Sequence, residues 1–159
     1  MDQGHFYYIK SQYFIDFPDP MLMRNKEILN GVKHNRPCFY TFKDMGTGLY
    51  WMIPISSKVS KYKSYYNAKI NKNGRCDTIL FGKVLGHEKA FLIQNMCPVT
   101  DQYIDCEYID SASNAPVSVS GNFEIELLRK AQKVLSIQRN GGHLIFPNIL
   151  EIQRQLLQK

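Results

Sequence analysis

Two hydrophobic periods alternate along this chain, and together they restrict it to a mixed fold. Aromatic and β-branched residues gather in short runs bounded by turn residues, which predicts strands over 6–10, 37–43, 49–55, 78–81 and 90–93. Elsewhere apolar residues recur every three or four positions, which predicts a helix over 57–72, a long helix from a cap at Ser120 or Asn122 to a stop at Asn140, and a last helix after Pro147. The order of these elements predicts an α+β fold, a small and mostly antiparallel β core with about three peripheral helices.

The remaining segments show no clear period. Pro18 and Pro20 open a mixed, mostly polar stretch that we expect to be a surface loop as far as Asn35. The strands over 78–81 and 90–93 are expected to join through Gly86-His87. With 159 residues and neither an internal repeat nor a linker, the chain is expected to form one domain over 1–159.

No apolar run approaches the length that crosses a bilayer, about 18–20 residues. The first residues also lack the basic and apolar regions of a secretion signal. We therefore expect a soluble, cytoplasmic protein with no membrane partner.

The positive charge is concentrated in one part of the chain. The formal net charge is +6, but residues 24–89 hold 13 basic and 4 acidic residues, and no acid lies between Met45 and Cys76. A positive field this concentrated predicts a polyanionic partner. A solvated helix face accounts for the same charges equally well, so the charge alone does not decide.

Aromatic residues between the lysines narrow this partner to unpaired RNA. Tyr62 and Tyr66 fall on the apolar stripe of the predicted helix and are expected in its core, whereas Tyr65 is off that stripe. Lys69 lies at the edge of the stripe, where its long side chain is expected to reach water. Aromatic faces stack on unpaired bases for about 1–3 kcal/mol each, while lysines follow the phosphates. The expected RNA-binding residues are Lys10, His34, Lys58, Lys61, Lys63, Tyr65 and Lys69.

The spacing of cysteine and histidine predicts no metal site. No two of the four cysteines have CxxC spacing, and the four histidines are scattered, whereas zinc ligands usually come in close pairs. The acidic stretch over 101–110 has no histidine beside it in sequence, and we expect a solvated loop there. The sequence therefore predicts neither a metal nor another cofactor, and it predicts that the four cysteines are reduced, small buried hydrophobes.

A serine pair stands at the head of the predicted basic helix. Ser56 and Ser57 lie where a predicted strand passes into the helix, and Lys58 follows them. Backbone N–H groups are unsatisfied at a helix start and the helix dipole is positive there, which favours a phosphate. The same serines are equally suited to cap the helix, and these few residues alone favour the capping role.

Five short blocks, in this order and spacing, give the chain a likeness to a known family. They are His5–Ile9 with Tyr13, His34–Phe39, Tyr50–Ser57, Cys76–Ile79 and Phe91–Met96. Together they resemble the toxins of type III toxin–antitoxin systems, the ToxN, AbiQ and CptN group, and most of all its CptN branch. The resemblance covers most of the chain, to at least Arg139.

This resemblance implies a fold and an activity. Such toxins have a compact β-barrel-like core with peripheral helices, similar to the MazF and Kid toxins. They are metal-independent endoribonucleases that leave a 2′,3′-cyclic phosphate and a 5′-hydroxyl. Their antitoxin is a small RNA repeat folded as a pseudoknot, which the toxin cuts from a precursor and then binds in closed toxin–RNA assemblies. Some members act in phage defence by abortive infection.

Four residues of this chain match positions that act in such toxins. The resemblance implies catalytic roles for Tyr13, Arg36, Ser56 and Ser57. Ser56 stands where ToxN has a threonine, which keeps the hydroxyl, but Arg36 stands where ToxN has a lysine. An arginine holds a phosphate through two hydrogen bonds and does not act as a general acid. No general base is identified by the sequence, although His34 lies two residues from Arg36.

Three hypotheses remain open at this point. The first is an RNA endonuclease toxin that is inhibited by an RNA. The second is a non-catalytic RNA-binding module, for which the basic helix suffices and the two serines are only a cap. The third is a structural protein with an incidental basic face, whose weak RNA binding would vanish at moderate salt.

Overall fold

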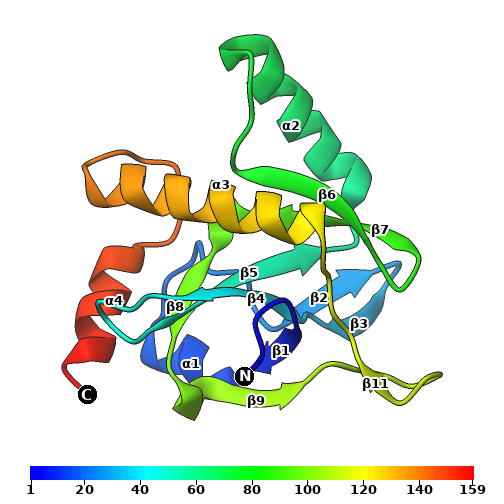
Figure 1. The fold of residues 1–159 in the computed structure, drawn as a ribbon, viewed down its shortest axis with the longest axis horizontal. Helices are drawn as coiled ribbons and strands as arrows, with labels where there is room; N and C mark the ends of the chain where they lie inside the picture. Colours follow the sequence, from blue (N-terminus) through cyan, green and yellow to red (C-terminus); the bar gives the residue numbers. More distant parts are fainter.

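An antiparallel sheet of seven strands forms the centre of the computed structural model, which describes residues 1–159 (Figure 1). The strand order is β6-β7-β5-β4-β1-β9, and β8 pairs with β5 beside this path. The seven strands are β1 (Phe6–Ile9), β4 (Cys38–Lys43), β5 (Tyr50–Ser56), β6 (Ile79–Val84), β7 (His87–Leu92), β8 (Cys97–Val99) and β9 (Ile104–Glu107). Two separate two-stranded ribbons are β2 (Lys26–Leu29) with β3 (Val32–Asn35), and β10 (Ile109–Asp110) with β11 (Ala115–Pro116).

Four α-helices surround the sheet. They are α1 (Ser11–Asp16), α2 (Val59–Asn73), α3 (Asn122–Arg139) and α4 (Ile149–Leu157), and 3-10 turns occupy Ile93–Asn95 and Asp101–Tyr103. The predicted strands and the three predicted helices are confirmed, with shifts at their ends, and so is the α+β class. No helix is both long enough and apolar enough to span a membrane.

Both faces of the sheet are buried, because neighbouring residues of its central strands enter different cores. Phe39 of β4 and Trp51 of β5 pack in one cluster with Leu127 and Val134 of α3. The next residue of each strand, Tyr40 and Met52, packs in a second cluster with Tyr13 of α1 and Leu156 of α4. Alternate side chains of a strand point to opposite faces. As a result, β4 and β5 are almost continuously apolar, which is why the sequence shows them clearly.

The pairing of the strands leaves the sheet open. The path begins at β6 and ends at β9, and no hydrogen-bonded pair joins these two strands. The expected barrel-like closure is therefore not confirmed, whereas the antiparallel core with peripheral helices is.

The predicted surface loop before Asn35 is wrong in its second half, because β2 and β3 form a hairpin there. Leu29 pairs with Val32 across the two residues Asn30 and Gly31, which have positive φ angles of 51° and 76°. Asn-Gly is the preferred pair for such a turn, because both positions require positive φ. The Asn-Gly pair was thus the signal for a hairpin in a stretch that looks merely polar.

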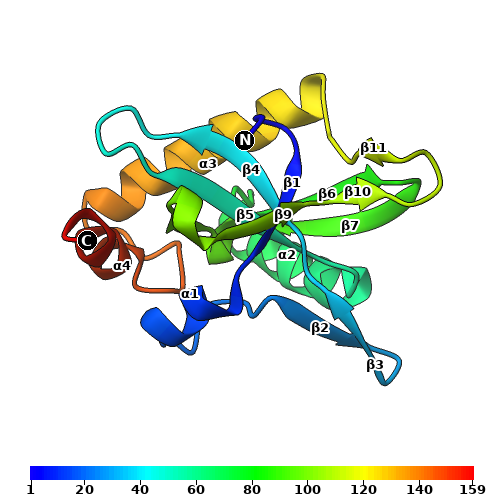
Figure 2. The same ribbon diagram turned by 90° about the horizontal axis from the view of Figure 1, so that it is seen from below.

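The hairpin of β6 and β7 is longer than predicted. Its turn consists of Leu85 and Gly86, so His87 belongs to the strand and pairs with Val84. His87 and Lys89 therefore lie two residues apart and leave β7 on the same side. In both views the β2–β3 and β6–β7 hairpins extend toward the same end of the molecule (Figures 1 and 2).

The serine pair does not cap α2 in the predicted way. The N-cap residue is Lys58, which makes no side-chain capping hydrogen bond, and the helix ends at Gly74 with a positive φ of 72°. Ser56 instead accepts a hydrogen bond at its Oγ from the backbone N–H of Lys58, at 3.1 Å. The chain thus turns from β5 into α2 around a buried serine.

Candidate active site between two hairpins

A cavity of ≈ 430 Å³ lies where the ends of the β2–β3 and β6–β7 hairpins meet the end of β5. Apolar side chains such as Leu29 and Val84 form part of its wall. Its polar or ionisable side chains come from six segments of the chain that are far apart in sequence. They are Tyr8, Glu27, His34, Asn35, Ser57, His87, Lys89 and Tyr108.

The carboxylate of Glu27 is the buried anchor of this cavity. Its Oε1 accepts a hydrogen bond of 2.5 Å from Ser56 Oγ, and its Oε2 accepts one of 3.3 Å from the backbone N–H of Ser57. Glu27 and Ser56 are 7% and 1% exposed. A buried carboxylate is tolerated when hydrogen-bond donors surround it. Glu27 therefore binds the backbone N–H of Ser57, a group that the sequence analysis considered for phosphate binding. It also holds the Ser56 side chain in the interior.

Ser57, in contrast, opens into the cavity. Its Oγ accepts a hydrogen bond of 2.6 Å from the Nζ of Lys89, so its own hydroxyl hydrogen stays available to a ligand. Lys89 makes no ion pair, and an ammonium group carries three donor hydrogens. The pair thus presents a positive charge and a hydroxyl donor at one point of the wall, which suits a phosphate oxygen.

Two imidazoles complete the wall, one from each hairpin. His34 is the cross-strand partner of Glu27, and paired residues of a hairpin project from the same face. His87 precedes Lys89 by two residues on β7. Both histidines are exposed, and neither side chain makes a hydrogen bond within the protein. The cavity therefore contains two imidazoles whose ring nitrogens have no partner within the protein.

An aromatic pair lines the floor on the side of β1. The rings of Tyr8 and Tyr108 meet edge to face, with centroids 5.7 Å apart. Burial, followed by the neighbouring Tyr108, raises the pKa of the Tyr8 hydroxyl to about 12. Tyr8 therefore stays protonated at neutral pH and offers a hydroxyl donor beside an apolar surface.

Arg36 lies beside this cavity and contributes to its frame. Its guanidinium donates from Nε to the carbonyl of Arg24 at 3.0 Å and from Nη1 to the carbonyl of Ile55 at 2.9 Å. Only 7% of the residue is exposed. Arg24 precedes β2, which carries Glu27, and Ile55 precedes Ser56 on β5. By binding both carbonyls, Arg36 holds these two segments together and so stabilises the Glu27–Ser56 contact.

Tyr13 is placed in the core below the sheet. It is fully buried, its hydroxyl donates to the carbonyl of Pro98 at 2.9 Å, and its ring packs against Phe17 and Tyr103. Burial raises the pKa of this hydroxyl well above its usual range. Tyr13 does not line the cavity, and the sequence alone gave no means to distinguish a buried tyrosine from an active one.

Some lysines of the predicted RNA surface are free of partners, and others are bound within the protein. Lys58, the N-cap of α2, and Lys61 in its first turn are exposed and make no ion pair, and Tyr65 further along the helix is 48% exposed. Lys63 is exposed too, but forms an ion pair with Glu88 at 2.7 Å. Lys10, on the other side of the molecule, donates to the carbonyl of Gln102 at 2.8 Å.

Lys69 points inward, contrary to the prediction that its side chain reaches water. Its Nζ donates to Thr78 Oγ1 at 2.6 Å and to Gln94 Oε1 at 3.1 Å. Burial lowers the pKa of this ammonium group. Two buried acceptors thus attract a residue that the helical period placed only at the edge of the apolar stripe.

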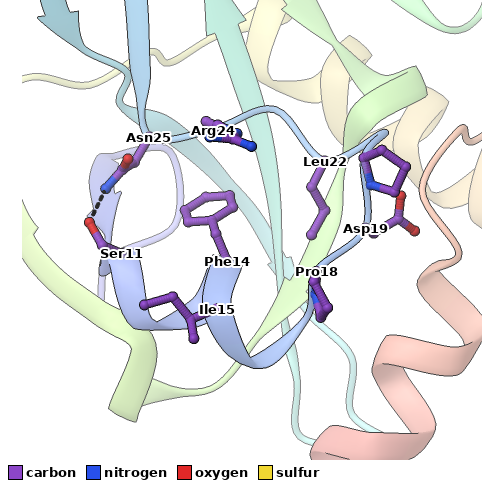
Figure 3. Close-up of a pocket in the computed structure, with 9 residues that line it drawn as sticks. Ser11, Phe14, Ile15, Pro18, Asp19, Leu22, Arg24 and Asn25 are labelled. Atoms are coloured by element: carbon purple, nitrogen blue, oxygen red, sulfur yellow. Dashed lines mark hydrogen bonds between the residues drawn. The ribbon is translucent and has the colours of Figure 1, made fainter.

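A second cavity, of ≈ 630 Å³ and thus larger than the first, lies between α1 and the segment before β2 (Figure 3). Figure 3 shows Phe14 of α1 pointing into the space bordered by Leu22, Arg24 and Asn25. Neither a histidine nor a lysine lines it. The proton-transfer groups are gathered in the smaller cavity, which is therefore the better candidate for chemistry.

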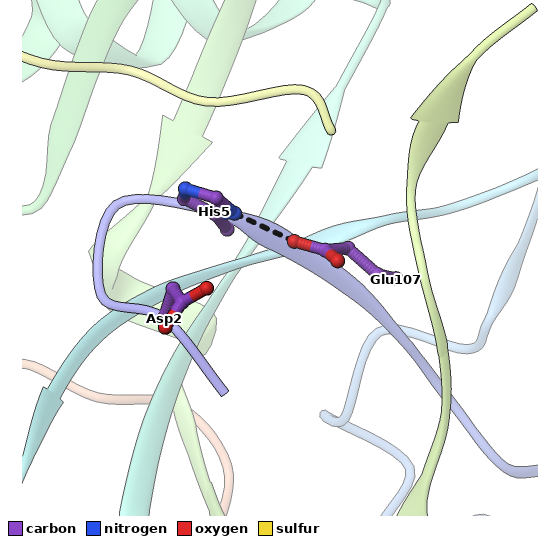
Figure 4. Close-up of side chains that lie close together, drawn as sticks. All are labelled: Asp2, His5 and Glu107. Carbon is purple, nitrogen blue, oxygen red and sulfur yellow. Dashed lines mark hydrogen bonds and ion pairs between the residues drawn. The ribbon is translucent and has the colours of Figure 1, made fainter. Parts of the chain in front are cut away.

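One cluster brings together side chains of the kinds that bind metals, and the sequence missed it. Pairing of β1 with β9 sets His5 Nδ1 at 2.6 Å from Glu107 Oε1, with Asp2 beside them (Figure 4). The acidic stretch over 101–110 was expected to be a solvated loop, and this prediction is wrong for Ile104–Glu107, which form β9 and bring Glu107 to His5. His5 and Glu107 already satisfy each other, so the cluster has an evident structural role in joining the chain start to the sheet edge.

The cavity residues that escaped the sequence analysis include Glu27, His87 and Lys89. Glu27 was assigned to a loop, His87 to a turn, and Lys89 only to the general positive charge. The Asn-Gly turn was the one signal available, since recognising that hairpin pairs Glu27 with His34. Nothing local in the sequence indicates that Lys89 contacts Ser57.

Comparison with known proteins begins from a negative result: no family model and no curated protein sequence matches the chain. Among solved structures, the chain is similar to AbiQ, a lactococcal anti-phage endoribonuclease belonging to the type III toxin–antitoxin system. The TM-score is 0.70, and the match covers 98% of this chain and 96% of that chain. The two chains share one fold. Their sequence identity is 10%, so the likeness concerns the fold and not individual residues.

Proposed function

We propose that residues 1–159 form one endoribonuclease domain, a type III toxin of the ToxN, AbiQ and CptN group and of its CptN branch. It cuts single-stranded RNA in the cytoplasm without a metal ion. The observation that carries the proposal is the convergence of Ser57, Lys89 and two histidines in one cavity. The fold shared with AbiQ and the five sequence blocks support the same activity.

The proposed reaction is an internal transesterification of RNA. The 2′-hydroxyl attacks the adjacent phosphorus, the bond to the 5′-oxygen breaks, and the products are a 2′,3′-cyclic phosphate and a 5′-hydroxyl. The extra negative charge of the phosphorane needs nearby donors. Lys89 and the Ser57 hydroxyl supply them, while Ser56 and Glu27 hold the Ser57 backbone in place.

The four residues implied by the resemblance have different roles in this proposal: one contacts the phosphate, and the others act through the structure around it. In this proposal Ser57 touches the phosphate, Ser56 and Arg36 hold Ser57 in position, and Tyr13 supports the sheet from the core on its other face. The bonds of Arg36 to two backbone carbonyls support a positioning role, because they leave little of the guanidinium for a ligand.

The proposed partner is a pseudoknot antitoxin RNA, which the toxin processes and which then inhibits it in a closed toxin–RNA assembly. The unpaired Lys58 and Lys61 on α2, with exposed Tyr65, support an RNA surface next to Ser57. Since AbiQ is an anti-phage protein, the proposal extends to a role in phage defence by abortive infection.

The experiment is incubation of the purified protein with single-stranded RNA in EDTA, followed by analysis of the product ends. We expect cleavage with cyclic-phosphate and 5′-hydroxyl ends, and its loss in Ser57→Ala but not in Ser60→Ala, an exposed serine of α2. Cleavage that needs an added divalent ion contradicts the mechanism. Binding without any cleavage favours the non-catalytic RNA-binding module.

A further inference from the structure

The four histidines of the chain have different surroundings. His5 is bound to Glu107, and His143 is exposed in the connection between α3 and α4. Only His34 and His87 line the cavity that contains Ser57. They belong to different hairpins, β2–β3 and β6–β7, so they approach the cavity from two separate elements.

The other ionisable groups that face this cavity are already bound or packed within the protein. Both carboxylate oxygens of Glu27 accept hydrogen bonds, and the residue is 7% exposed. The high pKa of Tyr8 keeps its hydroxyl protonated. Lys89 donates to Ser57, and Tyr108 packs edge-on against Tyr8. The two imidazoles remain, each with free ring nitrogens.

We propose that His34 and His87 are the general acid and general base of the RNA cleavage. One neutral imidazole takes the proton of the 2′-hydroxyl as the bond from that oxygen to phosphorus forms. The other, as an imidazolium, gives its proton to the 5′-oxygen as the bond from phosphorus to that oxygen breaks. Each histidine then holds the proton state that the other began with, and no further reactant is needed. This inference rests on the proposed function and deepens it.

Two substrates separate the roles of the histidines. The first is an RNA oligonucleotide containing a cut site mapped with the wild-type protein, and the second carries sulfur in place of the bridging 5′-oxygen at that site. A thiolate leaves without protonation, because the thiol is much more acidic than the alcohol. The variants are His34→Asn and His87→Asn, with His143→Asn as the matched control, and thermal melting checks that each is folded.

On ordinary RNA we expect each cavity variant to lose about 10²–10⁴ of the cleavage rate, the typical contribution of one acid or base, while the control keeps its rate. On the sulfur substrate, one of the two cavity variants should recover to within a few-fold of wild type, and the other should not. The variant that recovers lacks the acid. The bell-shaped pH profile expected for wild type should lose one limb in each variant.

The inference is overturned if both variants cleave ordinary RNA at nearly the wild-type rate, or if the sulfur substrate rescues both or neither. If the wild-type protein cuts RNA and the two variants cut it equally well, only the proposal of the acid–base pair is refuted. If the wild-type protein cuts no RNA, the proposed function is refuted together with the acid–base pair. The two failures are therefore distinguishable.

Discussion

The cavity and helix α2 are both basic, but they use their charges differently. Around α2, Lys63 is paired with Glu88 and Lys69 is bound to Thr78 and Gln94, so part of the charge stabilises the fold. In the cavity, Lys89 makes one hydrogen bond and no ion pair, and His34 makes neither. Charge along a helix thus indicates function only after the lysines that serve the fold, such as Lys63 and Lys69, are separated from those without a partner.

The largest expected effect contrasts two lysines. Lys89→Met should lower RNA cleavage by about 10²–10³, the usual result of removing one donor to a transition-state oxyanion. It should change the melting temperature little, because the side chain is only half-buried. Initial rates on single-stranded RNA, with thermal melting alongside, measure both effects.

Lys69→Met is the matched control for this change. It should leave the cleavage rate of the folded protein near wild type and lower stability by about 1–3 kcal/mol, because buried Gln94 loses its partner. If Lys69→Met abolished cleavage while Lys89→Met did not, the assignment of chemistry to the cavity would be reversed.

The neighbouring serines provide the next contrast. Ser57→Ala should lower cleavage about 10- to 100-fold, with a stability change below about 1 kcal/mol, because its hydroxyl opens into the cavity. Ser56→Ala should instead cost about 1–3 kcal/mol of stability, since the buried Glu27 loses a donor. Urea unfolding and cleavage rates, measured on both variants, test this division. If Ser57→Ala lost stability and activity to the same extent, the role of Ser57 would be structural and not catalytic.

A smaller effect is expected on RNA binding along α2. Lys58→Ala and Lys61→Ala should each weaken binding a few-fold and reduce the slope of log affinity against log salt by about 1. Lys63→Ala should change that slope less, because Glu88 already neutralises this charge. Titrations at several salt concentrations measure the slopes. Identical slopes for all three variants and the wild type would move the RNA surface away from α2.

The smallest effect concerns the charges at the end of α2, which connect it to α3. A hydrogen bond from Lys133, followed by the nearby Lys130 and Arg75, keeps the pKa of Asp77 below its usual value. A carboxyl with a lowered pKa in the folded state stabilises above its unfolded pKa of about 3.9, and the gain is lost as pH falls through the folded value.

Asp77→Asn should therefore lower the free energy of unfolding by about 0.5–1 kcal/mol at pH 7 and by almost nothing near pH 2. Asp105→Asn, at an exposed residue without an ion pair, serves as the control. Urea unfolding as a function of pH measures both variants. A difference for Asp77→Asn that did not shrink in acid would mean that its ion pairs are not the cause.

Most elements of the fold could be predicted because their periods are strong. The strands β4 and β5 are buried on both faces, and α3 has a regular apolar stripe through Leu127, Ala131 and Val134. The β2–β3 hairpin was missed because its strands are mostly exposed, so burial imposes no pattern on them. Only its turn residues carry the information.

The candidate site was harder to predict than the fold because its contacts are distant in sequence. Ser57 was identified from its place before a helix, but its partner Lys89 is 32 residues away, and Glu27 is 29 residues from Ser56. Arg36 seemed free to bind a phosphate as long as it stood in a loop. In the structure its guanidinium donates to the carbonyls of Arg24 and Ile55. The packing of the strands places these carbonyls there, and no local sequence pattern indicates it.

The most direct test of the central claim is the imidazole NMR spectrum of the protein with and without an uncleavable, 2′-O-methylated single-stranded RNA. The chain has four histidines, so the spectrum is simple to assign with single substitutions. If the cavity holds the scissile phosphate, the resonances of His34 and His87 shift on saturation while that of His143 does not. Saturated RNA binding with unshifted His34 and His87 resonances would contradict the account.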